Sequence, residues 1–213
     1  MDTSSPSSSS QVSSVPSDPL AKTVTLTANG QTSTMTYAEA LKGMVGKEVS
    51  ATFQDEAIKA QIVACYTFLR YYADRGQVPT VVFATPSNLN IQWGNNGVAR
   101  LERLIQEVGG KLMTINGKPI MSTFYAMSTG KTNNAEDVWN NTKDAFGNDL
   151  SYLVSVDSPW DTTASNFIST LTLTSAQLKT YVQSALGIVL SGDPSEWLRI
   201  NTRNSAGYVL SMS

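Results

Sequence analysis

The 213-residue sequence predicts an α+β fold, a single domain in which antiparallel β-hairpins accompany a segment of two helices. Polar and apolar side chains alternate over residues 23–27, Asn29-Gly30 follows, and residues 32–36 supply a return strand. Asn-Gly between two alternating segments is typical of a two-residue hairpin turn. Strands and helices do not alternate regularly along the rest of the chain, and no internal repeat occurs, so a βαβ architecture is not expected.

Two helices are expected directly after this hairpin. Residues 37–47 carry apolar side chains at helical spacing and include Gly46 near their end. Residues 54–73 predict a longer helix, because apolar side chains recur on one face at positions i, i+4, i+7 and i+11. This buried stripe consists of Ile58, Ile62, Cys65 and Leu69.

Shorter patterns predict the remaining elements. One amphipathic helix is expected at residues 98–108, where Gly109-Gly110 gives a stop signal, and another at residues 175–185. A loop rich in Asn and Asp is expected up to residue 148. Strands are expected at residues 81–83, 111–115, 119–127, 151–156, 167–173, 197–202 and 208–212.

The composition of the N-terminus differs from that of the remaining chain. Residues 1–20 are rich in Ser, Pro and Asp and are expected to form a disordered tail or linker, which places the domain at residues 21–213. The first residues lack the cationic and apolar regions of a signal peptide. No stretch reaches the roughly 18–20 apolar residues that a membrane-spanning helix needs.

Charge and residue usage narrow the possible functions. A net charge of −2 with 15% charged residues argues against a nucleic-acid binder, which needs a basic surface, and against a polybasic membrane anchor. The chain has no histidine and a single cysteine, so neither a disulfide framework nor a conventional zinc site can form. A site made only of carboxylate and carbonyl oxygens stays open, but no spacing calls for one. We therefore expect no metal and no cofactor, and we expect Cys65 to be a small core residue.

Two familiar catalytic patterns fail. Gly130-Lys131-Thr132 looks like the end of a phosphate-binding loop, but position 125 is a tyrosine where that motif needs glycine, and an Asn-rich segment follows instead of a helix. A Ser-His or Cys-His nucleophile cannot be built without histidine. A Ser-Lys dyad stays open, although no spacing singles one out. Proton chemistry therefore falls to the carboxylates.

Glu48 is distinguished by its position among these carboxylates. It follows Gly46-Lys47, where the first helix is expected to end, and precedes the turn into the longest helix. A carboxylate at this point can project into a groove between two helices. It can also be a solvated residue at a helix end, which is the more common situation for a surface carboxylate. Position alone favours the second interpretation.

Several strings of residues resemble a known family. The first pair is residues 40–49, ALKGMVGKEV, and residues 55–64, DEAIKAQIVA. The later matches are Gly109–Leu112, Pro119-Ile120, Phe124-Tyr125, Ser128–Gly130 with Thr132, residues 135–139 (AEDVW) and residues 152–161 (YLVSVDSPWD). In this order they are similar to the signature of the stage II sporulation protein D and amidase-enhancer (LytB) family. The resemblance extends from about residue 21 to the C-terminus.

The resemblance implies a lytic transglycosylase. Such an enzyme cuts the bond between muramic acid and glucosamine in peptidoglycan glycan strands, preferably strands without stem peptides, and leaves 1,6-anhydro ends. Carried over by position, Glu48 is the catalytic acid and base. Candidate substrate-binding residues are Lys59, Gln61, Tyr125 and Asp137. One carboxylate suits this chemistry, because a glycoside hydrolase needs two, whereas a single glutamate can protonate the leaving oxygen and then deprotonate the attacking hydroxyl.

The sequence also departs from the family pattern. Tyr66 stands where the family has arginine, Ala126 where it commonly has histidine, and Lys131 where it has a second glycine. These departures favour the alternative of a non-catalytic peptidoglycan-binding module or an activator of a cell-wall amidase with the same fold. The implied partners are glycan strands and, in that alternative, the amidase. The substrate implies an extracytoplasmic domain, anchored or secreted in a longer protein, and the family domain continues past a strand like residues 205–209.

Overall fold

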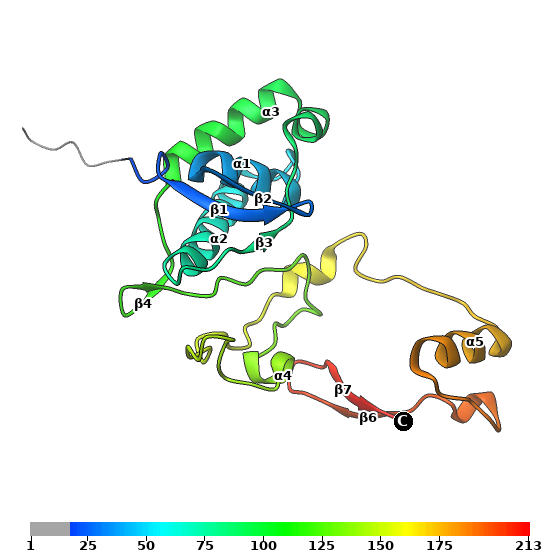
Figure 1. The fold of residues 1–213 in the computed structure, drawn as a ribbon. Helices are drawn as coiled ribbons and strands as arrows, with labels where there is room; N and C mark the ends of the chain where they lie inside the picture. Colours follow the sequence, from blue (N-terminus) through cyan, green and yellow to red (C-terminus); the bar gives the residue numbers. More distant parts are fainter. Residues whose placement is uncertain (1–17) are drawn as a thin grey trace, which may run out of the picture. The chain divides into compact units, whose positions relative to one another are not determined.

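The computed structural model describes residues 18–213, so the expected tail lies largely outside the described residues. This part of the chain divides into two compact units, one ending at Phe124 and one covering Tyr125–Ser213, and each is described by itself. Helices and short sheets occur in both units, which confirms the α+β class (Figure 1). The domain bounds of 21–213 stay a prediction.

A three-stranded sheet opens the first unit. It consists of β1 (Thr23–Ala28), β2 (Gln31–Thr36) and β3 (Thr80–Val81) in the order β2-β1-β3. β1 and β2 pair antiparallel, with Thr23 opposite Thr36, and β3 joins β1 in parallel. Asn29 and Gly30 have φ angles of 50° and 77°, the left-handed conformation that an Asn-Gly hairpin turn requires. The predicted hairpin is confirmed.

Three helices follow: the first two contact this sheet, and the third packs against the other two helices (Figure 1). They are α1 (Tyr37–Glu48), α2 (Asp55–Ala73) and α3 (Pro86–Val108). The start of α1 is fixed by a capping box, in which the Thr36 hydroxyl accepts from the Glu39 backbone N–H at 3.2 Å and the Glu39 carboxylate accepts from the Thr36 N–H at 2.9 Å. The predicted two-helix segment is therefore present, with Glu48 as the last residue of α1.

The third helix is longer than the sequence predicts. It begins at Pro86 instead of residue 98, because Thr85 caps it and proline is well suited to the first turn. Its first part is rich in Asn and Gly, which are weak helix formers, and so gives little signal. At Gly94 the backbone leaves the helical region with φ 63°, and the helix is broken there.

The core lies between the hairpin and the three helices. All four residues of the predicted α2 stripe are fully buried, as are side chains from α1 and α3. Burial of one large aliphatic side chain stabilises a fold by about 1.5–3 kcal/mol. Leu20 also belongs to this core at 3% exposure. The core includes Val24, Leu26, Leu41, Val45, Ile58, Ile62, Cys65, Leu69, Leu101, Leu104 and Ile105.

Arg100 of α3 holds the loop that joins α1 to α2. Its guanidinium donates to the backbone oxygens of Ala51 and Phe53 at 2.8 and 2.7 Å, and to the carboxylate of Asp55 at 2.7 Å. Arg103 also reaches Asp55, at 2.9 Å, but no backbone oxygen of this loop. One planar fork therefore fixes the chain immediately after Glu48.

Residues 79–84 are attached to the sheet and to α1. The Ala84 N–H donates to the Gly43 carbonyl at 2.9 Å, and the Phe83 ring lies against the backbone of Gly43. A Cβ placed at Gly43 would lie 2.1 Å from the nearest ring carbon. Glycine is therefore required here for close approach.

A short hairpin connects α3 to the rest of the first unit. Its strands are β4 (Thr114–Ile115) and β5 (Lys118–Pro119), which pair antiparallel. The strands expected at 111–115 and 119–127 are therefore much shorter in the structure.

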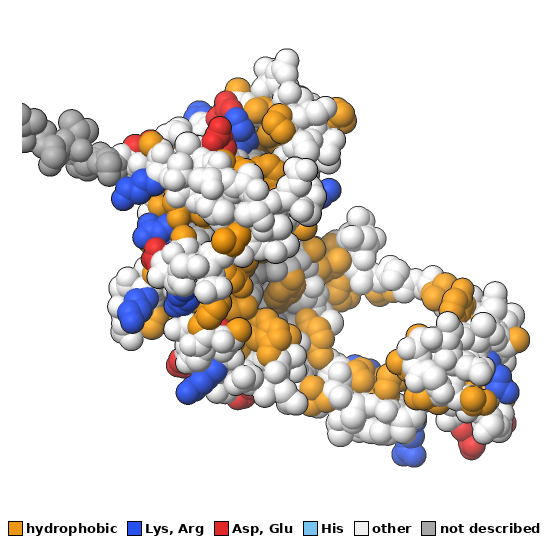
Figure 2. Space-filling view, viewed as in Figure 1, with side chains coloured by type: hydrophobic (Ala, Val, Ile, Leu, Met, Phe, Trp, Pro, Cys, Tyr) orange, Lys and Arg blue, Asp and Glu red, His pale blue; other side chains and the backbone are white. Residues whose placement is uncertain are grey.

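The second unit has few buried side chains. Its elements are α4 (Ala135–Trp139), a 3-10 helix η1 (Pro159–Thr163), α5 (Ser175–Leu186), a 3-10 helix η2 (Pro194–Glu196), β6 (Ile200–Arg203) and β7 (Val209–Met212). The expected helix at 175–185 and the strands near the C-terminus are confirmed. The strands expected at 151–156 and 167–173 are wrong, and α4 lies inside the expected loop. The apolar side chains of both segments, such as Val154 and Ile168, are exposed, and Figure 2 shows further hydrophobic side chains on the surface around α5.

We predict that Arg100→Lys destabilises the protein more than Arg103→Lys does. Lysine keeps the charge but cannot serve two carbonyls and a carboxylate together, so Arg100→Lys should lower the free energy of unfolding by about 1–3 kcal/mol. Arg103→Lys should cost less than about 1 kcal/mol, because its ion pairs are exposed. Urea unfolding of both variants measures the difference. Equal losses would contradict the role given to the Arg100 fork.

A second prediction concerns Gly43. Gly43→Ala should destabilise the wild type by about 1–3 kcal/mol, because the new methyl group must displace the Phe83 ring. In a Phe83→Ala background the same change should stabilise by up to about 1 kcal/mol, since alanine is the better helix former. Thermal unfolding of the four proteins in this cycle gives the coupling. The same loss of stability in both backgrounds would show that contact with the Phe83 ring is not its cause.

Candidate active site

Glu48 lines a cavity of about 250 Å³ that lies wholly within the first unit. Four chain segments contribute to its walls: α1, α2, the segment that starts with β3, and the segment after β5. The lining residues are Met44, Glu48, Phe68, Thr80, Val81, Val82, Ser122, Thr123 and Phe124. The sequence predicts a groove beside Glu48 but gives no sign that the other eight residues line it.

Two walls are fixed by α1 and β3. Met44 and Glu48 are one helical turn apart and therefore share one face of α1. The segment with Val81 and Val82 is held at both ends, by Thr27 N–H to Pro79 O at 2.8 Å and by the bond from Ala84 to α1. The carboxyl group thus lies at the end of a helix that the core holds in place.

Two buried hydroxyls attach the segments on either side of the β4–β5 hairpin to α2, and the segment after β5 is the third wall. Ser122 donates to the Ala64 carbonyl at 2.7 Å, and Thr67 accepts from the Met113 N–H at 3.0 Å. Both side chains are almost fully buried, where an unmade hydrogen bond would be costly. Residues 122–124 are therefore held against the helix that also supplies Phe68.

Glu48 is the only ionisable side chain among the described residues that line this cavity. Burial raises the pKa of its carboxyl above the ordinary value, and the neighbouring Lys47 ammonium opposes part of that rise. Removal of water disfavours the charged form of a carboxyl group. Glu48 therefore keeps its proton more readily than a glutamate in water does, as a general acid requires.

Cys65 and Gln61 lie one turn apart on α2, and neither lines the cavity, so the proposed contact of Gln61 with substrate stays a prediction. Burial raises the pKa of the Cys65 thiol to about 12, and the charge of Glu48 adds to the rise. The Gln61 amide donates to the Cys65 sulfur at 3.5 Å. The thiol therefore stays protonated at neutral pH, which fits the expected core role and not a nucleophile.

Lys59 does not line the cavity. Its ammonium bonds Glu56 at 2.8 Å and Glu107 at 2.6 Å, and so ties α2 to α3. Both hydrogen bonds raise the pKa of Lys59, the bond to Glu107 most. Lys59 therefore links two helices in the structure, and its role in substrate binding stays a prediction.

Tyr125 and Asp137 belong to the second unit. Burial raises the pKa of the Tyr125 hydroxyl, and the nearby Tyr208 adds to the rise. The Asp137 carboxylate accepts from the side-chain amides of Asn134 at 3.1 Å and Asn204 at 3.3 Å. Both groups thus have local partners, and their roles toward a substrate stay predictions.

The residue at the family's arginine position is buried. Tyr66 is 1% exposed, and its hydroxyl accepts from Arg70 at 3.3 Å. Its ring meets that of Tyr37 edge-on, with centroids 5.0 Å apart. Tyr66 therefore contributes packing where the family motif carries a cation.

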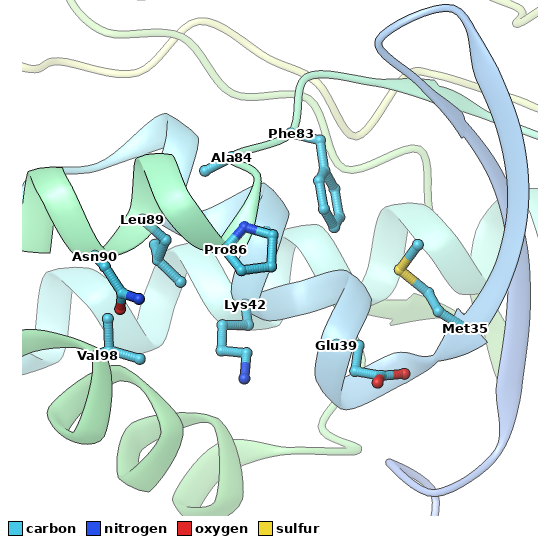
Figure 3. A pocket seen from close by; sticks show the side chains of 10 residues that line it. Met35, Glu39, Lys42, Phe83, Ala84, Pro86, Leu89, Asn90 and Val98 are labelled. Carbon is cyan, nitrogen blue, oxygen red and sulfur yellow. The ribbon is translucent and has the colours of Figure 1, made fainter. Parts of the chain in front are cut away.

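A larger cavity of about 440 Å³ lies on another side of α1 (Figure 3). Glu39 and Lys42 line it, but both are already paired. Hydrogen bonds from the Thr36 backbone and side chain lower the pKa of Glu39, and Lys42 bonds Glu102 at 2.7 Å. The raised pKa of Glu48 makes the smaller cavity the better candidate for proton transfer.

The described residues hold neither a cluster of metal ligands nor a membrane-spanning helix. Across residues 18–213, no group of three or more His, Cys, Asp or Glu side chains is placed to hold a metal ion. Over the same residues, no helix is long and apolar enough to cross a membrane.

The chain is similar in sequence to two curated proteins. No protein-family model matches it. Stage II sporulation protein D of Bacillus subtilis (strain 168) is 32% identical over 190 residues, covering 82% of this chain and 52% of that protein. Stage II sporulation protein D of Bacillus amyloliquefaciens is 29% identical over 190 residues, with the same coverage.

The chain therefore spans about half the length of the curated relatives that it matches. The similarity nonetheless covers most of the present chain. The chain belongs to the stage II sporulation protein D family.

Proposed function

We propose that the chain acts on peptidoglycan glycan strands as a lytic transglycosylase with Glu48 as its acid and base. The observation that carries the proposal is a single glutamate with a raised pKa, lining a largely apolar cavity, in a chain similar to stage II sporulation protein D. The names of the relatives associate them with sporulation, and we propose that the present chain takes part in the cell-wall remodelling of sporulation. Because peptidoglycan lies outside the cytoplasmic membrane, the domain would act there.

In the proposed reaction one carboxyl group carries both proton transfers. Protonated Glu48 donates to the oxygen that links muramic acid to glucosamine, and the bond between that oxygen and C1 of the muramic acid breaks. The 6-hydroxyl of the same muramic acid then bonds to C1 and gives its proton to ionised Glu48. The products are a free 4-hydroxyl and a 1,6-anhydro end, no water is consumed, and Glu48 regains its proton.

The surroundings of Glu48 favour this route over hydrolysis. A glycoside hydrolase needs a second carboxylate at about 5–9.5 Å across the scissile bond. The next acidic residues along the chain are engaged elsewhere, since Asp55 bonds Arg100 and Arg103 and Glu56 bonds Lys59. An internal hydroxyl that replaces water removes the need for a second carboxylate.

The second candidate is a non-catalytic peptidoglycan-binding module or amidase activator. The observation in its favour is Tyr66, which replaces the family's arginine with a buried ring. The departures at Ala126 and Lys131 lie in the second unit and point the same way. Cleavage of glycan strands by the purified chain distinguishes the two candidates.

We predict that Glu48→Gln abolishes cleavage without unfolding the protein. The amide keeps the shape but cannot donate and recover a proton, so the rate should fall by about 10²–10⁴-fold. Glu56→Gln is the matched control, because Glu56 is exposed on the neighbouring helix and outside the cavity. The assay digests peptide-free glycan and weighs the fragments, since anhydro ends are lighter than hydrolysed ends by one water.

Two results would contradict this proposal in different ways. Cleavage by Glu48→Gln at the wild-type rate would remove Glu48 from the mechanism. Hydrolysed ends as the sole product would reject the internal attack even if Glu48 proved essential.

We further predict that kcat/KM falls as pH rises through the pKa of Glu48. Only the protonated carboxyl can donate, and burial raises its pKa, so the fall should lie at higher pH than for a solvated glutamate. Lys47→Gln removes a charge that lowers this pKa and should move the fall to still higher pH. Lys22→Gln is the control for a general effect of net charge. If the fall of kcat/KM lay at the same pH in Lys47→Gln as in wild type, Glu48 would not be the group that causes it.

A further inference from the structure

The end of α1 that carries Glu48 needs hydrogen-bond partners from outside the helix. The last carbonyl groups of an α-helix lack N–H partners within the helix itself. The Val45 carbonyl accepts from the Val49 N–H at 3.0 Å, which closes the last turn. The Gly46 carbonyl, two residues before Glu48, accepts from the indole N–H of Trp93 at 3.1 Å. A side chain of α3 therefore caps α1 beside its last residue.

The first part of α3 packs closely against this helix end. Leu89 and Trp93 are one helical turn apart and therefore lie on one face, and they are 3% and 6% exposed. A Cβ placed at Gly46 would lie 2.2 Å from the Leu89 side chain, so glycine permits the close approach of the two helices. A buried indole N–H is costly to leave unpaired, so its bond to Gly46 favours one placement of this part of α3.

The break in α3 comes directly after Trp93. Gly94 has φ 63° and ψ 168°, a conformation that only glycine adopts readily. A Cβ placed at Gly97 would lie 3.1 Å from the Trp93 Cβ and 3.6 Å from the Ala51 Cβ. The break therefore brings Trp93 close to the second part of α3, which also contacts the turn after Glu48.

We infer that Trp93 is a positioning residue for Glu48. The indole holds the carbonyl two residues before Glu48, and the Arg100 guanidinium holds the Ala51 carbonyl three residues after it. Neither Trp93 nor Arg100 lines the cavity, so both act through the backbone and not on a substrate. The effect on the reaction rests on the proposed function, whereas the effect on the position of Glu48 can be measured without it.

The titration of Glu48 reports how well its carboxyl group is shielded. Burial raises its pKa, Lys47 on α1 lowers it, and its charge acts on the Cys65 thiol on α2. The cavity segments 80–82 and 122–124 carry no titratable side chain. Trp93 is uncharged, so a changed pKa of Glu48 in a Trp93 variant reports changed shielding and not a lost charge.

The variant Trp93→Phe tests the inference, because it removes the indole N–H and keeps an aromatic ring. The end of α1 should fray, and the pKa of Glu48 should fall toward that of a solvated glutamate. NMR titration of carbon-13-labelled glutamate side chains measures this pKa. At a pH where Glu48 is protonated in both proteins, kcat on peptide-free glycan should fall by about 2- to 10-fold, the effect expected for one hydrogen bond. KM should not change, since Trp93 lies outside the cavity.

Leu89→Ala is the matched control for lost packing. Leu89 contacts the same glycine of α1, but its side chain cannot donate a hydrogen bond. The variant should lower the unfolding temperature while the pKa of Glu48 and kcat stay at their wild-type values. An equal shift of this pKa in Leu89→Ala would show that packing, and not the indole bond, holds Glu48, and would overturn the inference.

Gly94→Ala tests the same contact through the backbone. It should shift the pKa of Glu48 in the direction of Trp93→Phe, because alanine resists the conformation that places the indole. Gly30→Ala is its control, since Gly30 also has a positive φ and open space for a Cβ but lies in the β1–β2 turn. Gly30→Ala should leave the pKa of Glu48 unchanged.

Each other outcome has a defined meaning. If Trp93→Phe leaves both the pKa of Glu48 and kcat at wild-type values, the inference is overturned and the proposed function stands. If the wild type cleaves no glycan, the proposed function fails, and the NMR titration still decides whether Trp93 holds Glu48. If Trp93→Phe does not fold, Gly94→Ala against Gly30→Ala decides, and equal pKa values of Glu48 in these two variants would overturn the inference.

Discussion

The position of Glu48 depends on how the turn between α1 and α2 is held. Arg100 donates to two backbone oxygens of that turn and to the first residue of α2. Glu48 is an exposed residue whose carboxyl is only partly shielded from water, and a flexible turn would let the end of α1 fray and remove that shielding. With the turn fixed, the Glu48 carboxyl stays beside the cavity, and partial loss of water raises its pKa. One guanidinium thus links the fold to the acidity of the site.

The opposite wall depends on buried hydrogen bonds. Residues 122–124 belong to no strand, yet Ser122 holds them to the Ala64 carbonyl 58 positions earlier in the chain. A buried hydroxyl without its partner is costly, so this single bond favours one placement of the segment strongly. The cavity is therefore built by a helix end on one side and an irregular segment on the other, both held by polar contacts to the helical core.

The sequence predicted what local signals determine. The Asn29-Gly30 turn, the stripe on α2 and Glu48 at a helix end all depend on residues close together in the chain. The Phe68 and Ser122 contributions to the cavity could not be predicted, because they depend on contacts between distant segments. Lys59 shows the same limit, since its partner Glu107 lies 48 positions away. The strand expected at 151–156 failed for a related reason: its apolar residues stay exposed, and pattern alone does not report burial.

A single acid and base must be able to hold its proton and also to release it. Burial favours the protonated form of Glu48, and Lys47 favours the ionised form, so neither state is excluded. The nearby Cys65 thiol of the core preserves this balance, because it stays neutral. A second carboxylate in the lining would hold the proton more tightly and hinder the first transfer. Because the lining holds no second ionisable group, Glu48 stays able to act in both directions.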